Sequence, residues 1–185
     1  MNVSKQQSNN SESSPLTKRI TLVLFVMYAI ALIWILLLKL GVQFSYMETR
    51  SVNVIPFREA FLFNGRIDYS EIIMNVVVFV PLGIYAGMLF RRWAFWKNLL
   101  FFFLTSCMVE VIQWLLKIGA FDVTDMITNT SGGILGFVIC KVIEKLFNNQ
   151  GRAHGFINIM AGIGTVLMLL FLILLKTNRL GIRYQ

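Results

Sequence analysis

The chain has 185 residues, of which 57% are hydrophobic and 14% charged, and its formal net charge is +8. A soluble domain of this size would carry roughly a quarter charged residues, so this composition excludes a soluble globular protein and indicates a polytopic membrane protein. The basic residues stand in short clusters beside the apolar runs, as membrane proteins place charge against lipid headgroups. The charge therefore indicates membrane lipids as partners, and not nucleic acid.

The first 17 residues are rich in Ser, Asn and Gln. Because they lack the apolar side chains needed to fold, we expect residues 1–17 to form a disordered tail. The first apolar run begins only at Ile20 and is too long for the hydrophobic core of a cleaved signal peptide, so no such signal is expected.

Five apolar stretches are long enough to cross a hydrocarbon core of ~30 Å. We expect them in one domain, residues 18–178, followed by a short basic tail, residues 179–185. The sequence thus predicts an all-α membrane protein, a polytopic helical bundle of about five transmembrane helices. The expected spans are Ile20–Leu38, Ile72–Phe90, Asn98–Leu116, Asp125–Ile143 and Phe156–Leu175.

The connection between the first two spans, Lys39–Glu71, is the longest. Within it, Phe57, Phe61 and Phe63 alternate with charged residues such as Arg58. We expect so aromatic a segment to lie in the membrane interface, or to re-enter the bundle, as an amphipathic piece.

The second and fourth spans carry glycines that favour close helix packing. Gly83 and Gly87 follow Pro81, whose missing NH is expected to kink the helix, and Gly132 and Gly136 repeat the same spacing. Such pairs let helix backbones approach closely inside a membrane. We expect the second, third and fourth spans to form a compact core, with the first and fifth at its periphery.

The distribution of basic residues favours a cytoplasmic N-terminus in the cell membrane. The tight clusters flank the shortest loop, and short loops count most for orientation, whereas the basic C-terminal tail points the other way. With this orientation the cytoplasmic side holds nine Lys and Arg residues and the outer side eight. The nine are Lys5, Lys18, Arg19, Arg91, Arg92, Lys97, Lys141, Lys145 and Arg152; the eight are Lys39, Arg50, Arg58, Arg66, Lys117, Lys176, Arg179 and Arg183.

Polar side chains of three spans and two loops should meet at one end of the bundle. Glu110 lies at membrane depth, where a carboxylate costs ~2.5 kcal/mol or more on insertion scales and usually marks a site. Successive spans run in opposite directions. The polar residues therefore all lie near the same membrane face, whichever way the protein is inserted. The candidate ligand-binding residues are Arg50, Asn53, Asn75, Glu110, Gln113, Asp122, Asp125 and Asn129, with Arg58 nearby.

Each of these groups also has a purely structural explanation. Glu110 and Gln113 could hydrogen-bond across helices, as could the asparagines, and Asp122 and Asp125 bracket a helix start that carboxylates cap. No cofactor or metal site is expected: Cys107 and Cys140 lie in apolar spans, and we place His154 in a connecting loop without a second ligand. Convergence is what favours a functional site.

At these residues the sequence resembles the VanZ-like family. The resemblance covers about residues 50–137, and the chain departs from the family pattern in lacking a basic residue just before Asp122, where it reads Gly119-Ala120-Phe121. The matching blocks are Arg50-x-x-Asn53-x-x-Pro56-Phe57, Asn75-x-x-x-Phe79-x-Pro81-Leu82-Gly83, Glu110-x-x-Gln113, and Phe121-Asp122-x-x-Asp125-x-x-x-Asn129-x-x-Gly132 with Gly136.

The resemblance implies an integral membrane protein associated with teicoplanin resistance. One hypothesis is a non-enzymatic protein that engages the glycopeptide or a lipid-linked cell-wall precursor at the polar site near the outer face. The alternative is an intramembrane or lipid-modifying enzyme, with Glu110 and Asp122 or Asp125 as an acid/base pair and Arg50 holding a phosphate. A stand-alone transporter is disfavoured, since the five spans contain no visible inverted repeat.

Overall fold

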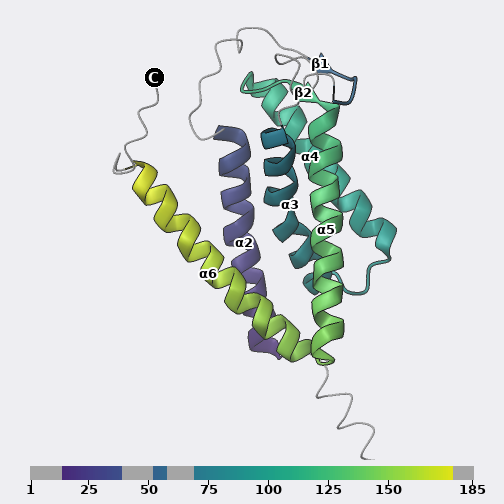
Figure 1. Ribbon diagram of the computed structural model, residues 1–185, viewed down its shortest axis with the longest axis vertical. Coiled ribbons are helices and arrows are strands. Elements are labelled where there is room, and N and C mark those ends of the chain that lie inside the picture. Colours follow the sequence, from purple (N-terminus) through teal and green to yellow (C-terminus); the bar gives the residue numbers. More distant parts are fainter. Residues whose placement is uncertain (1–13, 39–51, 58–68, 177–185) are drawn as a thin grey trace, which may run out of the picture. The chain divides into compact units, whose positions relative to one another are not determined.

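The computed structural model describes residues 14–38, 52–57 and 69–176, and within them it is almost entirely helical. The two strands of the described residues are each two residues long (Figure 1). The elements are α2 (Pro15–Leu38), β1 (Val52–Asn53), α3 (Tyr69–Leu89), α4 (Phe95–Leu116), β2 (Phe121–Asp122), α5 (Val123–Phe147) and α6 (Gln150–Lys176).

Among the described residues, four helices are long and apolar enough to cross a membrane: α2, α3, α4 and α5. The fifth expected span falls within α6. The prediction of an all-α, multi-pass membrane protein is confirmed. The interfacial segment expected over residues 39–71 lies outside the described residues except for 52–57 and 69–71.

Helix α2 begins inside the segment expected to be a tail. Pro15 is its first residue, where its fixed φ suits a helix and its missing NH does no harm. The NH of Thr17 donates to the hydroxyl oxygen of Ser14 at 3.2 Å, which caps the helix. Residues 15–17 are therefore helical.

The chain packs as two compact units, Ala29–Lys141, the central unit, and Met1–Tyr28 with Val142–Gln185, the terminal unit. In the central unit α3 and α5 touch backbone to backbone. A Cβ added at Gly83 would collide with the carbonyl of Gly133, and one at Gly136 would collide with the carbonyl of Val80. The predicted role of these glycines in close packing is confirmed.

A two-residue strand pair lies at the end of the central unit where α4 ends and α5 begins (Figure 1). The strands are parallel, with Val52 opposite Phe121 and Asn53 opposite Asp122. Helix α4 stops at the left-handed Lys117, whose NH bonds back to the carbonyls of Gln113 and Trp114. The pairing fixes the loop after α4 against the segment that precedes α3.

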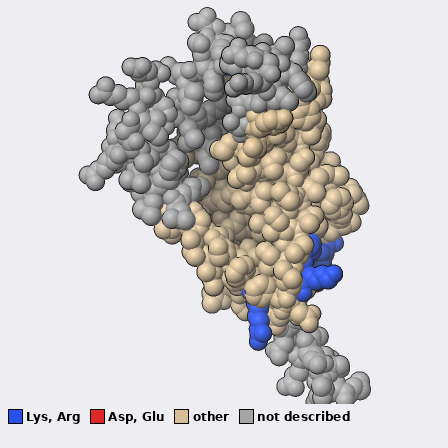
Figure 2. Space-filling view, in the orientation of Figure 1, with Lys and Arg blue, Asp and Glu red and all other residues tan. Residues whose placement is uncertain are grey.

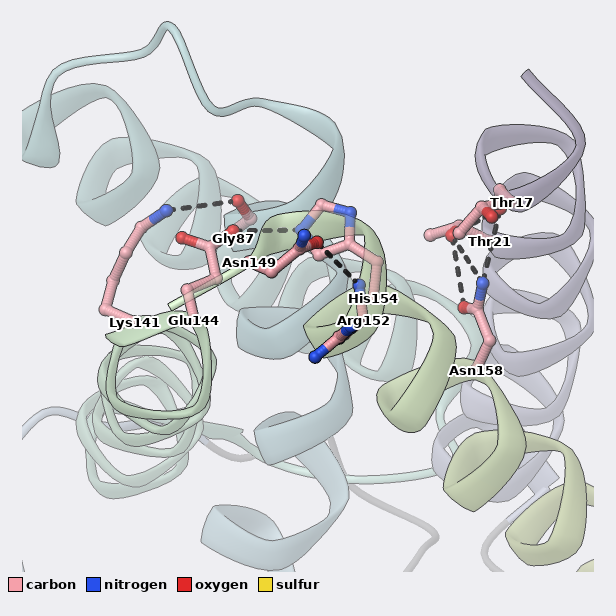
Figure 3. A network of polar contacts seen from close by, with 9 residues as sticks. All are labelled: Thr17, Thr21, Gly87, Lys141, Glu144, Asn149, Arg152, His154 and Asn158. Atoms are coloured by element: carbon pink, nitrogen blue, oxygen red, sulfur yellow. Dashed lines mark hydrogen bonds and ion pairs between the residues drawn. The ribbon is translucent and has the colours of Figure 1, made fainter. Parts of the chain in front are cut away.

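In the terminal unit the start of α2 is clamped to α6 by a buried amide (Figure 3). The side chain of Asn158 donates to the carbonyl of Thr17 at 3.2 Å and pairs with the hydroxyl of Thr21 at 3.0 to 3.1 Å. Each partner satisfies a polar group that would otherwise be buried alone, so the clamp fixes the register of α2 on α6.

The placement of His154 in a loop was wrong. Asn149 caps α6 by accepting from the NH of Arg152 at 3.1 Å, so the helix begins early and includes His154. The imidazole is buried, with Nε2 2.9 Å from Oε1 of Glu144 (Figure 3). The ring thus links α6 to the last turns of α5 within the terminal unit.

Candidate functional site

Two carboxylates come together at the strand-pair end of the central unit. The side chain of Glu110, on α4, is 1% exposed. Its Oε2 accepts a hydrogen bond from the backbone NH of Asp122, on β2, at 3.1 Å. A buried carboxylate requires donors of this kind to offset its loss of hydration. Glu110 therefore fixes where the loop after α4 passes.

Asp122 is held in place by both of its carboxylate oxygens. Oδ1 accepts from the NH of Thr124 at 2.6 Å, which caps the N-terminus of α5. Oδ2 accepts from the side-chain amide of Asn53 at 2.9 Å, because the parallel register sets Asn53 opposite Asp122. The structural explanation of Asp122 as a helix cap holds, and the same carboxylate also joins the two strands.

The segment after β1 is anchored to the same helix start. The NH of Phe57 donates to Oγ1 of Thr124 at 2.9 Å. Phe57 has φ 61°, a left-handed conformation that a bulky side chain adopts only at a cost. This hydrogen bond helps to hold Phe57 in that conformation. It also places Pro56 and Phe57 at the start of α5, near the carboxylates.

A second pair lies on α3 and α5. The side-chain amide of Asn75 donates to Oδ1 of Asp125 at 2.7 Å. Asn75 stands six residues after the start of α3 and Asp125 in the first turn of α5, so the bond crosses between the two helices at the strand-pair end. The charged acceptor makes this interhelical bond stronger than one between neutral groups.

One turn further along α5, Asn129 is 1% exposed. Its amide nitrogen donates to the hydroxyl of Ser106, on α4, at 3.0 Å. The side-chain oxygen of Asn129 is buried and accepts no hydrogen bond from the described residues. An amide oxygen so placed can accept a further hydrogen bond from a donor that enters the site.

The structure brings together the seven described residues that the sequence predicted. Gln113 is buried on the same face of α4 as Glu110. The hydrogen bonds above join the others in three groups: Asn53 with Asp122 and Glu110, Asn75 with Asp125, and Asn129 with Ser106. Arg50 and Arg58 lie outside the described residues. We call the set the polar cluster: Asn53, Asn75, Ser106, Glu110, Gln113, Asp122, Thr124, Asp125 and Asn129.

Ser106 and Thr124 were missed by the sequence analysis. Ser106 stands four residues before Glu110, and this spacing places both side chains on one helical face. Thr124 follows Asp122 at a helix start, where hydroxyls commonly bond to nearby backbone. Both signals were present in the sequence.

The polar cluster is rich in acceptors. Within the part of the chain that the structure describes, no three His, Cys, Asp or Glu side chains are arranged to hold a metal ion. Carboxylate and amide oxygens suit ligands that present NH or OH groups, such as peptide amides and sugar hydroxyls. In the described structure, donors of the chain itself already bond several of these oxygens.

Comparison with known proteins identifies the family of this chain. The family profile described as VanZ/LLP1 matches residues 25–144, which include the whole polar cluster. The chain is 34% identical over 165 residues to Protein VanZ of Enterococcus faecium, covering 87% of this chain and 94% of that protein. No solved structure matches the chain. The chain belongs to the VanZ-like family of membrane proteins.

Proposed function

We propose that this protein contributes to resistance against glycopeptides of the teicoplanin type. In this proposal the polar cluster lies near the outer membrane face and binds the antibiotic or a lipid-linked cell-wall precursor. Support comes from membership of the VanZ-like family and from the polar cluster at one end of three membrane-spanning helices. The N-terminus is then cytoplasmic, and the loop after α4 faces outward.

The orientation rests on the basic residues of the short α3–α4 connection. Arg91 and Arg92 lie there and Lys97 follows in the first turn of α4, all exposed. Short loops rich in Lys and Arg stay in the cytoplasm. Since the α3–α4 connection and the polar cluster are separated by the length of α4, a cytoplasmic connection puts the cluster on the outer side.

The hydrogen bond from the NH of Asp122 to the carboxylate of Glu110 carries the proposal. It holds two acidic side chains at the membrane boundary, backed by the buried amide oxygen of Asn129. Peptide amides and sugar hydroxyls of a glycopeptide are donors that such oxygens accept, and its acyl chain can lie beside apolar helices. The same holds for the peptide and sugar part of a lipid-linked precursor.

An acid/base enzyme is the second candidate, because Glu110 is buried while Asp122 is half-buried. An acid/base pair divides the two roles between carboxylates in different surroundings. Against this, Asp122 already caps α5 and bonds Asn53, so it has a structural role without catalysis. Binding requires no proton transfer by Asp122, so it is the first candidate.

The test is glycopeptide susceptibility of a strain that lacks the chain and is complemented with variants. We expect the wild type to raise the teicoplanin inhibitory concentration more than that of vancomycin, and Glu110→Gln and Asn129→Leu to abolish the increase. Ser131→Ala, an exposed change on α5, is the matched control and should behave as wild type. Membrane levels of each variant are compared by immunoblot.

If the wild type changes neither inhibitory concentration, the resistance proposal is wrong. Glu110→Gln could instead keep full resistance while Asn129→Leu loses it. The carboxylate of Glu110 would then have only a structural role, and the acid/base alternative would be eliminated. Loss of turnover of a lipid substrate in Glu110→Gln, with binding intact, would favour the enzyme over the binding protein.

A further inference from the structure

The other end of the central unit carries a surface of basic and aromatic side chains. Arg91 and Arg92 form the turn between α3 and α4, and Trp93 and Trp96 are 39% and 59% exposed beside them. Lys97 is exposed in the first turn of α4. We call these five residues, with Lys141 of α5, the basic–aromatic end.

Ring stacking holds the turn in shape. The rings of Phe90 and Trp93 stack at 4.3 Å with 12° between their planes, and Phe101 packs edge-on against both, at 5.6 and 6.2 Å. The NH of Trp93 also donates to the carbonyl of Phe90 at 2.9 Å. The two arginines between these rings therefore stand on a fixed support, which reduces the entropy lost when they bind a ligand.

A lysine from a third helix reaches the same end. Nζ of Lys141 lies 3.4 Å from the carbonyl of Gly87, near the C-terminus of α3 (Figure 3). The same atom lies 5.4 Å from the centre of the Phe137 ring. The Phe137 ring in turn contacts Phe95, in the first turn of α4, with ring centres 6.0 Å apart. Lys141 is thus placed among the ends of α3 and α4.

The sequence around this end contains few acidic residues, although Glu144 follows Lys141 by about one helical turn. The sequence contains no Asp or Glu between Met74 and Val109, or between Thr130 and Ile143. Figure 2 shows Lys and Arg side chains on the described surface of one face, and no Asp or Glu there. Ala94 provides no side-chain cap for α4, so the partial positive charge of that helix start adds to the surface.

We propose that the basic–aromatic end binds the headgroup of an anionic phospholipid. Guanidinium groups pair with phosphate through two parallel hydrogen bonds, and lysines near a headgroup add electrostatic attraction. Trp93 and Trp96 are exposed beside these cations, and tryptophans are enriched at headgroup level in membrane proteins. The acyl chains lie along the lipid-facing side chains of α4, among them Leu100 and Leu104, which are exposed.

This site is separate from the polar cluster, because the two occupy opposite ends of α4. It differs from general charge attraction in its fixed geometry. The arginines lie in the α3–α4 turn with the Phe90–Trp93 stack, and Lys141 of α5 lies over the ring of Phe137, which contacts Phe95 of α4. A fixed arrangement should select one headgroup charge and position, whereas scattered charges should respond only to the number of cations.

Native mass spectrometry of the full purified chain tests the proposal. Delipidated protein is titrated with phosphatidylglycerol, or with phosphatidylcholine of the same acyl chains. We expect phosphatidylglycerol to bind at least about tenfold more tightly. The triple variant Arg91→Gln, Arg92→Gln, Lys97→Gln should lose this preference.

The control triple Arg19→Gln, Lys145→Gln, Arg152→Gln removes the same charge from exposed positions of the terminal unit and should retain it. Arg92→Gln alone should weaken binding roughly fivefold. This single variant replaces the triple variant in the test if the triple variant does not fold.

Equal binding of the two lipids by the wild type would overturn the proposal. So would equal losses in the two triple variants, since total charge would then explain the attraction. Release of phosphatidylglycerol by an excess of inorganic phosphate would identify free phosphate as the ligand, and would overturn the lipid assignment too.

Discussion

The carboxylate of Glu110 accepts its hydrogen bond from the backbone NH of Asp122, and not from that residue's side chain. The carboxylate of Asp122 remains available to cap α5 and to bind Asn53. One backbone group thus lets two acidic residues stand close together without competing for the same donor. The arrangement orders the loop after α4 as part of the polar cluster.

Two replacements of Glu110 should separate the effect of its charge on stability from the effect of its hydrogen bond. Glu110→Gln keeps an oxygen that can accept from Asp122, so we expect little loss of stability. Glu110→Leu leaves that NH without its partner and should cost about 1–3 kcal/mol. Thermal unfolding in detergent, followed by tryptophan fluorescence, measures both, with the lipid-facing Val111→Leu as control. Equal destabilisation by Gln and Leu would contradict the role of the hydrogen bond.

The pair Asn75 and Asp125 should show energetic coupling between α3 and α5. We expect the two single changes to leucine and the double change to give a coupling of about 1 kcal/mol, in the range of polar contacts between membrane helices. Reversible unfolding in mixed detergent and SDS gives the change in unfolding free energy of each of the three variants relative to the wild type. Effects that add to within ~0.3 kcal/mol would show that the 2.7 Å contact contributes no net stability.

Glycine replacements should separate close packing from helix propensity. Gly136→Ala forces a methyl group against the carbonyl of Val80 and should cost about 1–3 kcal/mol. Gly162→Ala, on α6, meets no atom within 4 Å and should be neutral or stabilising by up to about 1 kcal/mol. The same unfolding assay compares them. If both variants gain stability, α3 and α5 do not pack as described.

The clamp between α2 and α6 should depend on the amide of Asn158. Asn158→Leu removes the hydrogen bonds of the amide to Thr17 and Thr21, so we expect a loss of about 1 kcal/mol. The hydroxyl of Thr21 keeps its bond to the carbonyl of Thr17 within α2. Thr21→Val should lose less, because Asn158 keeps the carbonyl of Thr17. The exposed Ile159→Leu is the control. A larger loss from Thr21→Val than from Asn158→Leu would reverse this order.

Hydropathy predicted the helices because apolar length is a local property of the sequence. Their ends were less accurate, since caps decide them: Ser14 starts α2 at Pro15 and Asn149 starts α6 at Gln150, several residues before the apolar runs. The error placed His154 in a loop, although it lies buried in a helix. Short polar caps are difficult to distinguish from loop residues by composition.

The sequence was enough to predict that the residues of the polar cluster lie near one another. It was not enough to predict which of them are hydrogen-bonded to each other. Alternating helix direction was enough to bring Asn75, Glu110 and Asp125 to one end. The pairing of β1 with β2 joins residues about 70 positions apart through backbone groups, which no side-chain pattern reports. For that reason the bond from Asn53 to Asp122 emerged only from the structure.

Cysteine labelling in intact cells tests the outward position of the polar cluster most directly. In a background with Cys107 and Cys140 changed to serine, Lys117→Cys places a thiol beside the cluster and Lys145→Cys places one near the far end of α5; both positions are exposed. A membrane-impermeant maleimide should label position 117 and reach position 145 only after the membrane is permeabilised. Labelling of 145 alone in intact cells would put the cluster in the cytoplasm and contradict the proposed encounter with a glycopeptide.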